Sequence, residues 1–182
     1  MNLKKSIVPA LCTMLCFGGA QASILDLYIG ATGGMGSERY IVDGPMAAVV
    51  DDFTKSAVSY GAVMGIDIPV IRLEIEYNHV DTDVLKTNMT MGNVLFKLLP
   101  MPIITPYIGF GGGMQYGGSF KDFGVDVNEN WAAQGMIGLT FAVPATAMKI
   151  DVEGRAIYMP DVYEDNLDAL HYEGRLKLRY QF

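Results

Sequence analysis

Few residues in the sequence could act as a nucleophile with its base. Past residue 22 there are two histidines, His79 and His171, and Ser59 is the one serine well inside a segment with strand character. Acyl transfer requires a serine, a histidine and a carboxylate within hydrogen-bond reach. His171 shares a strand face with Glu173, but nothing in the sequence brings Ser59 near them. We therefore expect no enzyme and no catalytic residue, with a lipid-modifying enzyme as an alternative.

Two other motifs have the residue types of ligand sites without their spacing. The segment "DVYEDNLDAL" (161–170) is rich in carboxylates but lacks the ordered spacing and the glycine of a calcium loop. The segment "GFGGG" (109–113) is not followed by the helix that a phosphate-binding loop opens. We interpret the first as solvated loop charge and the second as a glycine-lined strand, and expect no metal and no cofactor.

The first 22 residues predict a secretory signal peptide. Lys4 and Lys5 precede an apolar stretch (7–17) too short to span a bilayer, and "AQA" (20–22) is a small-residue cleavage site. We expect Sec-dependent export and one mature domain, residues 23–182. Both cysteines lie in the signal peptide, so the mature chain can form no disulfide or thiolate metal site.

Composition and charge narrow the class of protein further. The chain is 51% hydrophobic, yet its mature part contains no apolar run of 18 residues, which favours strands over a helical membrane span. Without Lys4 and Lys5, 11 of the 13 basic residues remain against 20 acidic ones, a net charge of −9. Such an acidic chain is not expected to bind nucleic acid.

Eight segments alternate between apolar and polar residues, each about the length that a tilted strand needs to cross a bilayer. They are residues 24–34, 57–67, 71–79, 87–98, 106–116, 131–141, 148–158 and 170–182. The polar faces carry both charge signs in near balance. The charged and titratable residues expected to meet inside are Arg72, Glu74, Glu76, Lys97, Lys149, Asp151, Glu153, Arg155, His171, Glu173, Arg175, Lys177 and Arg179.

The connections alternate in character, as they do in an up-and-down barrel. Those after the second, fourth and sixth segments are short and hold proline, whereas the others are longer on average and acidic. We predict an all-β fold, an eight-stranded antiparallel up-and-down transmembrane β-barrel, with both termini at the short-turn side. A soluble barrel with an apolar interior is the alternative. Aromatic residues near the ends of the apolar faces favour the membrane: Tyr77, Trp131, Phe141, Tyr158 and Tyr172.

Side-chain parity is strongly fixed in the membrane reading. A lysine or arginine that faces lipid at the bilayer midplane costs roughly 2–4 kcal/mol. A one-residue slip of the last strand would turn Arg175 and Lys177 outward. An eight-stranded barrel is just wide enough for side chains to fill it, so these charges predict a plugged lumen.

The motifs "PYIGFGGG" (106–113) and "LRYQF" (178–182), with the alternating Glu/Arg third and seventh segments, resemble the OmpA-like and opacity-protein group of small outer-membrane barrels. The resemblance covers residues 23–182. It implies a Gram-negative outer membrane, periplasmic termini and a structural, adhesive or antigenic surface role. It also implies that Tyr180 and Phe182 form a signal for the barrel-assembly machinery. The separate cell-wall-binding domain of full-length OmpA proteins is not found here, so that role is not expected.

The expected partners are outer-membrane lipids, the assembly machinery and a surface ligand. Loop one, about residues 35–56, is the longest predicted connection and contains the apolar stretch "GPMAAVVDDF" (44–53), which could contact that ligand or pack on the barrel rim. A narrow porin-like channel is a further alternative, because charged residues inside a barrel can form a gate as well as a plug.

Overall fold

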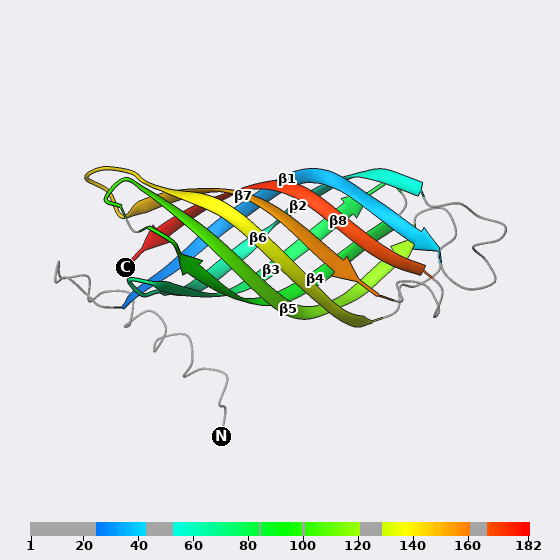
Figure 1. Cartoon of the computed structure of the whole chain (residues 1–182). Helices are drawn as coiled ribbons and strands as arrows, with labels where there is room; N and C mark the ends of the chain where they lie inside the picture. Colours follow the sequence, from blue (N-terminus) through cyan, green and yellow to red (C-terminus); the bar gives the residue numbers. More distant parts are fainter. Residues whose placement is uncertain (1–24, 43–52, 84, 100, 121–128, 161–166) are drawn as a thin grey trace, which may run out of the picture.

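Eight antiparallel strands close on themselves in a computed structural model of the chain (Figure 1). The structure describes residues 25–42, 53–83, 85–99, 101–120, 129–160 and 167–182. The strands are β1 (Asp26–Val42), β2 (Phe53–Asp67), β3 (Ile71–Thr82), β4 (Leu85–Lys97), β5 (Ile104–Phe120), β6 (Asn130–Ala142), β7 (Met148–Met159) and β8 (Leu167–Gln181). Each pairs with its neighbours in sequence, and β8 pairs with β1. The predicted up-and-down barrel is confirmed.

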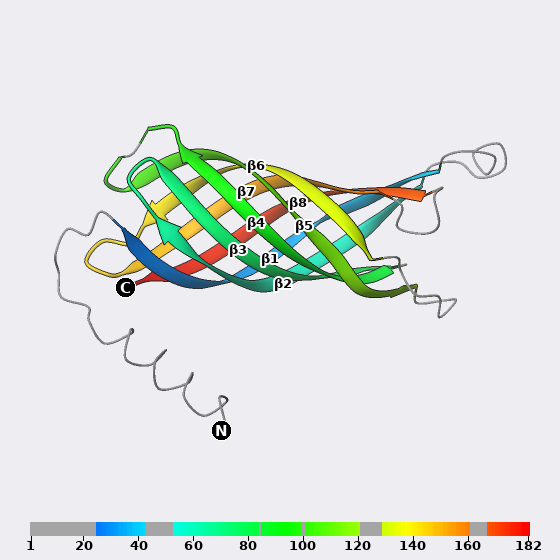
Figure 2. The same ribbon diagram turned by 90° about the horizontal axis from the view of Figure 1, so that it is seen from below.

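The two ends of the barrel differ. At one end, here called the turn end, three short turns join β2 to β3, β4 to β5 and β6 to β7, at residues 68–70, 98–103 and 143–147. The first residues of β1 and the last of β8 lie at this end, where the Phe182 amide donates to the Leu27 carbonyl at 2.9 Å. Figure 2 shows the C-terminus beside the start of β1. The other end, called the loop end, is where β1 finishes and β2 begins.

Alternation along each strand separates an apolar outer wall from a polar interior. In β3 every second residue from Arg72 to Val80 is buried, while Leu73, Ile75 and Tyr77 are exposed. In β6 and β7 the burial pattern alternates in the same way. Most exposed residues of the outer wall are large and apolar, with Ile137 at 64% exposure. An apolar outside around a charged inside is the arrangement of a membrane barrel, and it excludes the soluble alternative.

All eight strands are longer than the predicted segments, and the differences are largest in β1 and β5. Alternating burial in β1 continues past residue 34 to Tyr40, and β2 already begins at Phe53. The predicted loop one, residues 35–56, is therefore wrong at both ends: the connection covers residues 43–52. Ser37 and Ser56, both in the predicted loop, lie opposite each other in paired strands. Nearly all of the stretch "GPMAAVVDDF" lies outside the described residues.

Charge sorts between strands and connections as the sequence predicted. Within the strand bounds, ten acidic and ten basic residues balance each other. The other ten acidic residues of the mature sequence, and one lysine, fall in the connections at the loop end. The charges within the strand bounds therefore cancel, and the net charge of −9 belongs to the connections at the loop end.

Close backbone approach explains the inward glycines of β5. A Cβ atom built on Gly111 would lie 1.9 Å from Asn93 Oδ1, and one on Gly113 would lie 1.9 Å from the Thr90 carbonyl oxygen. Gly112, between them, faces outward, and the nearest atom to its Cβ would be 3.7 Å away. Only the inward positions of this glycine run therefore require the absence of a side chain.

Candidate functional site: the charged lumen

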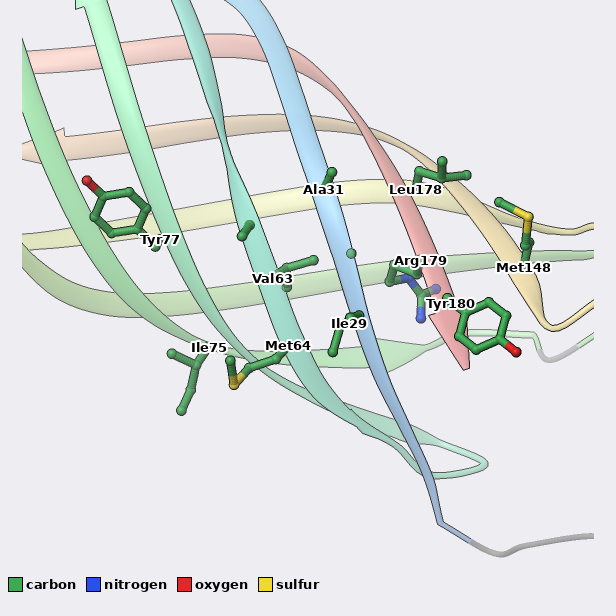
Figure 3. Close-up of a pocket in the computed structure, with 12 residues that line it drawn as sticks. Ile29, Ala31, Val63, Met64, Ile75, Tyr77, Met148, Leu178, Arg179 and Tyr180 are labelled. Carbon is green, nitrogen blue, oxygen red and sulfur yellow. The ribbon is translucent and has the colours of Figure 1, made fainter. Parts of the chain in front are cut away.

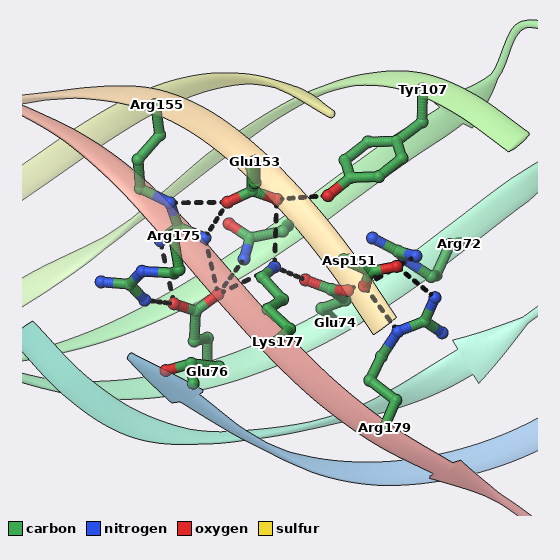
Figure 4. A network of polar contacts seen from close by, with 12 residues as sticks. Arg72, Glu74, Glu76, Tyr107, Asp151, Glu153, Arg155, Arg175, Lys177 and Arg179 are labelled. Carbon is green, nitrogen blue, oxygen red and sulfur yellow. Dashed lines mark hydrogen bonds and ion pairs between the residues drawn. The ribbon is translucent and has the colours of Figure 1, made fainter. Parts of the chain in front are cut away.

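The centre of the lumen is organised around Glu76. Its two carboxylate oxygens accept from Arg155 Nη1 at 2.9 Å and Arg155 Nη2 at 3.1 Å, a two-point contact between β3 and β7 (Figure 4). Arg175 of β8 also contacts Glu76 Oε1, and Lys177 Nζ lies 3.4 Å from Oε2. Glu76 is completely buried. One carboxylate thus holds three cations from the opposite wall of the barrel.

Lys177 connects this hub to two more carboxylates. Its Nζ atom lies 2.8 Å from Glu74 Oε2 and 3.2 Å from Glu153 Oε2. Glu153 also binds Arg155 and accepts a 2.9 Å hydrogen bond from the Tyr107 hydroxyl. A completely buried ammonium is tolerated because carboxylates surround it, since an unpaired buried charge is very costly.

A second layer lies nearer the turn end. Asp151 accepts from Arg179 Nε at 2.6 Å and Arg179 Nη2 at 2.9 Å, and from the Thr140 hydroxyl at 2.6 Å. The Arg72 guanidinium lies 2.9 Å from Glu74 Oε1 and 3.3 Å from Asp151 Oδ2. It also stacks over the Tyr107 ring at 4.6 Å. This layer joins β3, β7 and β8 across the lumen.

Asp67 closes the lumen at the turn end. It contacts Lys97, and its Oδ2 atom lies 3.1 Å from Lys149 Nζ and 3.6 Å from Arg179 Nη1. The side chains of Lys97 and Lys149 are 15% and 23% exposed, so the cluster sits at the mouth. Cations from four strands therefore lie at this end: Arg72 of β3, Lys97 of β4, Lys149 of β7 and Arg179 of β8.

The half of the lumen toward the loop end is largely apolar. Its core contains three methionines, Met89, Met91 and Met159, with small and branched residues around them. The full cluster is Tyr40, Ala57, Val80, Met89, Met91, Ala132, Ile157, Met159 and Ala169. The sequence analysis predicted a lumen of charges and did not identify this layer. Met89 and Met91 share the parity of Lys97, but they carry no charge and the alternation of residues 87–98 is weak.

One polar chain crosses this apolar half. Ser59 Oγ donates to Glu173 Oε2 at 2.5 Å, and His171 Nε2 lies 3.2 Å from the same oxygen. His171 Nδ1 lies 3.5 Å from Glu38 Oε2. Arg175 Nη2 donates to Ser59 Oγ at 3.0 Å. The structure therefore brings Ser59 to the His171–Glu173 pair, which the sequence analysis did not foresee.

The described group of Ser59, His171 and Glu173 does not have the arrangement of a nucleophile and its base. The Ser59 hydroxyl donates to a carboxylate rather than to His171, and the Arg175 guanidinium donates to its oxygen. Ser59, His171 and Glu38 are 2% exposed or less. The other histidine, His79, is on the outer wall, where Nδ1 lies 2.9 Å from Asn88 Oδ1 and the ring lies 5.1 Å from Tyr60.

All thirteen residues expected in the lumen point inward. Eleven are at most 5% exposed, and only Lys97 and Lys149, at the mouth, are half-buried. Of the five residues expected at the membrane interface, Tyr77, Trp131 and Tyr172 are exposed, and Phe141 and Tyr158 are half-buried. Tyr180 and Phe182 are exposed and packed edge to face, with ring centroids 5.2 Å apart.

Neutral polar residues complete the network and were not predicted as part of it. Gln134 Nε2 donates to Asn93 Oδ1 at 2.6 Å, and Asn78 Nδ2 donates to Glu76 Oε1 at 2.6 Å. Asn78, Asn93 and Gln134 stood on predicted polar faces, which was the available signal. Glu38 could not be found, because it lies past the predicted end of its strand.

The outer wall carries an apolar hollow of about 540 Å³ over β1, β2, β3 and β8 (Figure 3). Its floor contains Ala31 and Ala62, which are paired across β1 and β2, and larger side chains such as Met64 and Tyr180 surround them. No serine, histidine or carboxylate is among the residues that line it. The hollow is thus part of the apolar outer wall.

The described residues contain no group of three or more histidine, cysteine or acidic residues placed to hold a metal ion. No helix among them is long and apolar enough to cross a membrane.

Comparison with solved structures places the fold among small outer-membrane barrels. Neisserial surface protein A is similar with a TM-score of 0.63 and 14% sequence identity, over 86% of this chain and 97% of that one. The N-terminal β-barrel domain of OprF from Pseudomonas aeruginosa is similar with a TM-score of 0.57 and 16% identity, over 89% and 100%. No family model and no curated protein matches the sequence. At these identities the likeness concerns the fold alone: this chain has the eight-stranded barrel fold of these outer-membrane proteins.

Proposed function

We propose that this protein is a non-conducting barrel of the Gram-negative outer membrane that acts through its loop end, as a structural envelope protein or as a surface adhesin or antigen. The observation that supports it most is the Glu76 hub. Arg155, Arg175 and Lys177 reach it from the other side of the lumen. Fully buried side chains that bridge the lumen act as a plug. Because solutes do not pass through a plugged lumen, the protein acts through its outer surfaces.

Three further proposals follow from the same orientation. The chain is exported by a signal peptide, residues 1–22, and leaves both termini in the periplasm. The exposed rings of Tyr180 and Phe182 form the signal that the barrel-assembly machinery recognises. The loop end, with its net charge of −9, faces the outside and carries the surface contact. Neisserial surface protein A, which shares the fold, is by its name a surface protein.

Replacing residues 43–52 by a Gly/Ser linker of equal length tests the surface role. We expect vesicles that carry this variant to bind cultured epithelial cells several-fold less than vesicles with the unaltered barrel, because loop one holds the apolar stretch beside paired acids. Bound vesicles can be counted by a lipid dye. A matched variant replaces residues 161–166 in the same way and reports on acidic loops in general. Equal binding by all three proteins would remove loop one as the contact.

A narrow channel is the second candidate, since the half-exposed Lys97 and Lys149 form a cationic mouth at the turn end. The plugged lumen predicts that purified barrel in planar bilayers gives no steady current above that of the bare lipid. Single-channel recording at several voltages measures this directly. A current that rises linearly with voltage and scales with the amount of protein would establish the channel instead.

A further inference from the structure

The turn end carries apolar side chains where water is expected. The turns at 68–70 and 98–103 contain no charged residue, and their larger side chains are well exposed. Exposure is 58% for Val70, 56% for Leu98, 65% for Leu99, 49% for Met101 and 59% for Ile103. These two turns are called the apolar turns below. The third turn, 143–147, has no exposed large apolar residue.

The apolar turns are neighbours and continue the lipid-facing wall. The Lys97 amide donates to the Val70 carbonyl at 2.9 Å and joins one turn to the other. Leu98 follows Phe96 on the outward face of β4, and Ile103 leads into the outward Ile104 of β5. The exposed apolar surface therefore runs without a break from the wall onto the turns.

Part of the backbone of these turns is paired within the protein, which is what lipid requires of polar backbone groups. The Ile68 amide donates to the Ile71 carbonyl at 2.9 Å, and the Leu98 amide donates to the Pro106 carbonyl at 2.9 Å. Side chains cover two carbonyls: Lys97 Nζ donates to Ile68 O at 2.8 Å, and Thr105 Oγ1 to Met101 O at 3.3 Å.

Proline reduces the number of donors that need a partner. Of the nine residues in the apolar turns, three are proline, at positions 69, 100 and 102, and proline has no N–H group. The side chains of the other six have no hydrogen-bonding group. A protein partner would normally meet a polar rim with hydrogen bonds around the contact, whereas a lipid leaflet requires none.

At the loop end of the β3–β4 wall, the apolar band on the outer face ends earlier than it does on β8. On β3 the outward face becomes polar at His79, and on β4 at Thr90, where Thr90 Oγ1 contacts the Tyr116 hydroxyl at 2.8 Å. On β8, across the barrel, the outward face remains apolar up to Tyr172. The apolar band is therefore shifted toward the turn end on the β3–β4 wall.

We infer that the barrel is inclined in the membrane, with the β3–β4 wall displaced toward the loop-end side so that the apolar turns are seated in the lipid leaflet at the turn end. The partner of this surface is the lipid leaflet itself. This orientation depends only on the barrel spanning a bilayer. It depends neither on the surface role of the loops nor on the state of the lumen, so those proposals can fail separately.

Single-cysteine spin labels test the orientation, because the chain has no cysteine beyond position 16. The variants are Leu99→Cys and Met101→Cys in the apolar turns and Ala147→Cys in the third turn as the control. The protein is the mature barrel, folded into phospholipid vesicles with no other protein present. Collision with oxygen, which enters lipid, is compared with collision with a water-soluble nickel complex.

At the turn end we expect the labels at 99 and 101 to collide with nickel several-fold less often than the label at 147. At the loop end, His79→Cys and Tyr172→Cys form the second pair, on opposite walls. Here we expect the label at 79 to collide with nickel more often than the label at 172. Gel mobility before and after heating confirms that each variant is folded.

Equal nickel accessibility within either pair would overturn the inference. Protection of positions 99 and 101 that appears only after a periplasmic protein extract is added would also overturn it, since the surface would then be a protein contact. An inclined barrel is supported if the labels at 99 and 101 are protected from nickel in pure lipid vesicles and the label at 79 is more accessible to nickel than the label at 172.

Discussion

Replacing Glu76 by alanine should lower the free energy of unfolding by about 3–5 kcal/mol, the usual cost of removing one partner from a buried ion pair. Glu76 contacts both Arg155 and Arg175, and Lys177 lies 3.4 Å from its Oε2. Without it, two guanidinium groups repel each other inside the lumen. The remaining carboxylates, Glu153 and Glu173, cannot neutralise them fully, because each already has other partners.

The matched control is Ile75→Ala on the same strand. Ile75 is 60% exposed and faces lipid, so its truncation removes only part of an apolar contact. Equilibrium unfolding by urea in lipid vesicles, followed by the fluorescence of Trp131, measures both variants. Glu76→Gln should fall between them, since the amide oxygen can still accept hydrogen bonds. If Glu76→Ala were no more destabilising than Ile75→Ala, the network would not hold the barrel together.

Replacing Ile137 by arginine should destabilise the folded barrel in a bilayer by roughly 2–4 kcal/mol, the cost of a basic residue that faces lipid near the midplane. Ile137 lies near the middle of β6, and its side chain is 64% exposed on the outer wall. A guanidinium at this position has no ion pair within reach on the apolar wall and must draw water or lipid headgroups toward it.

Ser56→Arg is the control for Ile137→Arg. Ser56 is also outward-facing, on β2, but it lies close to the loop end. Near the interface the same substitution is expected to cost only about 0–1 kcal/mol. The same vesicle unfolding assay compares the two. Equal costs at both positions would mean that the outer wall of β6 does not lie in the hydrocarbon region.

Side-chain parity is the part of this fold that local sequence predicts well. The rule that alternate residues point to opposite faces needs no knowledge of partners, so Arg72, Glu74 and Glu76 could be placed together on one side of β3 from the sequence. Charge balance and the aromatic residues then indicated that this side is the interior. All thirteen expected lumen residues do point inward for this reason.

Strand length was predicted less well. Glycine and serine usually indicate loops, and the segment at 33–37 contains both. In the barrel this segment is opposite Tyr60 through Ser56 of β2 on one side and Leu176 through Tyr172 of β8 on the other. Hydrogen bonding on both edges outweighs the weak strand propensity of these residues. The extension carries Glu38 into the lumen, where it meets His171.

The sequence by itself determined which side chains face lipid and which face the axis, because alternation along a strand is a local property. Only the tertiary structure decided which charges meet. Glu76 and Arg155 are 79 positions apart, and Ser59 and Glu173 are 114 apart. Their contact depends on the register of all eight strands and on the closure of β8 against β1. The apolar layer has the same origin: parity places Met89 and Met91 on the inward face of β4, but only the closed barrel gathers them into one cluster with Tyr40 and Ile157.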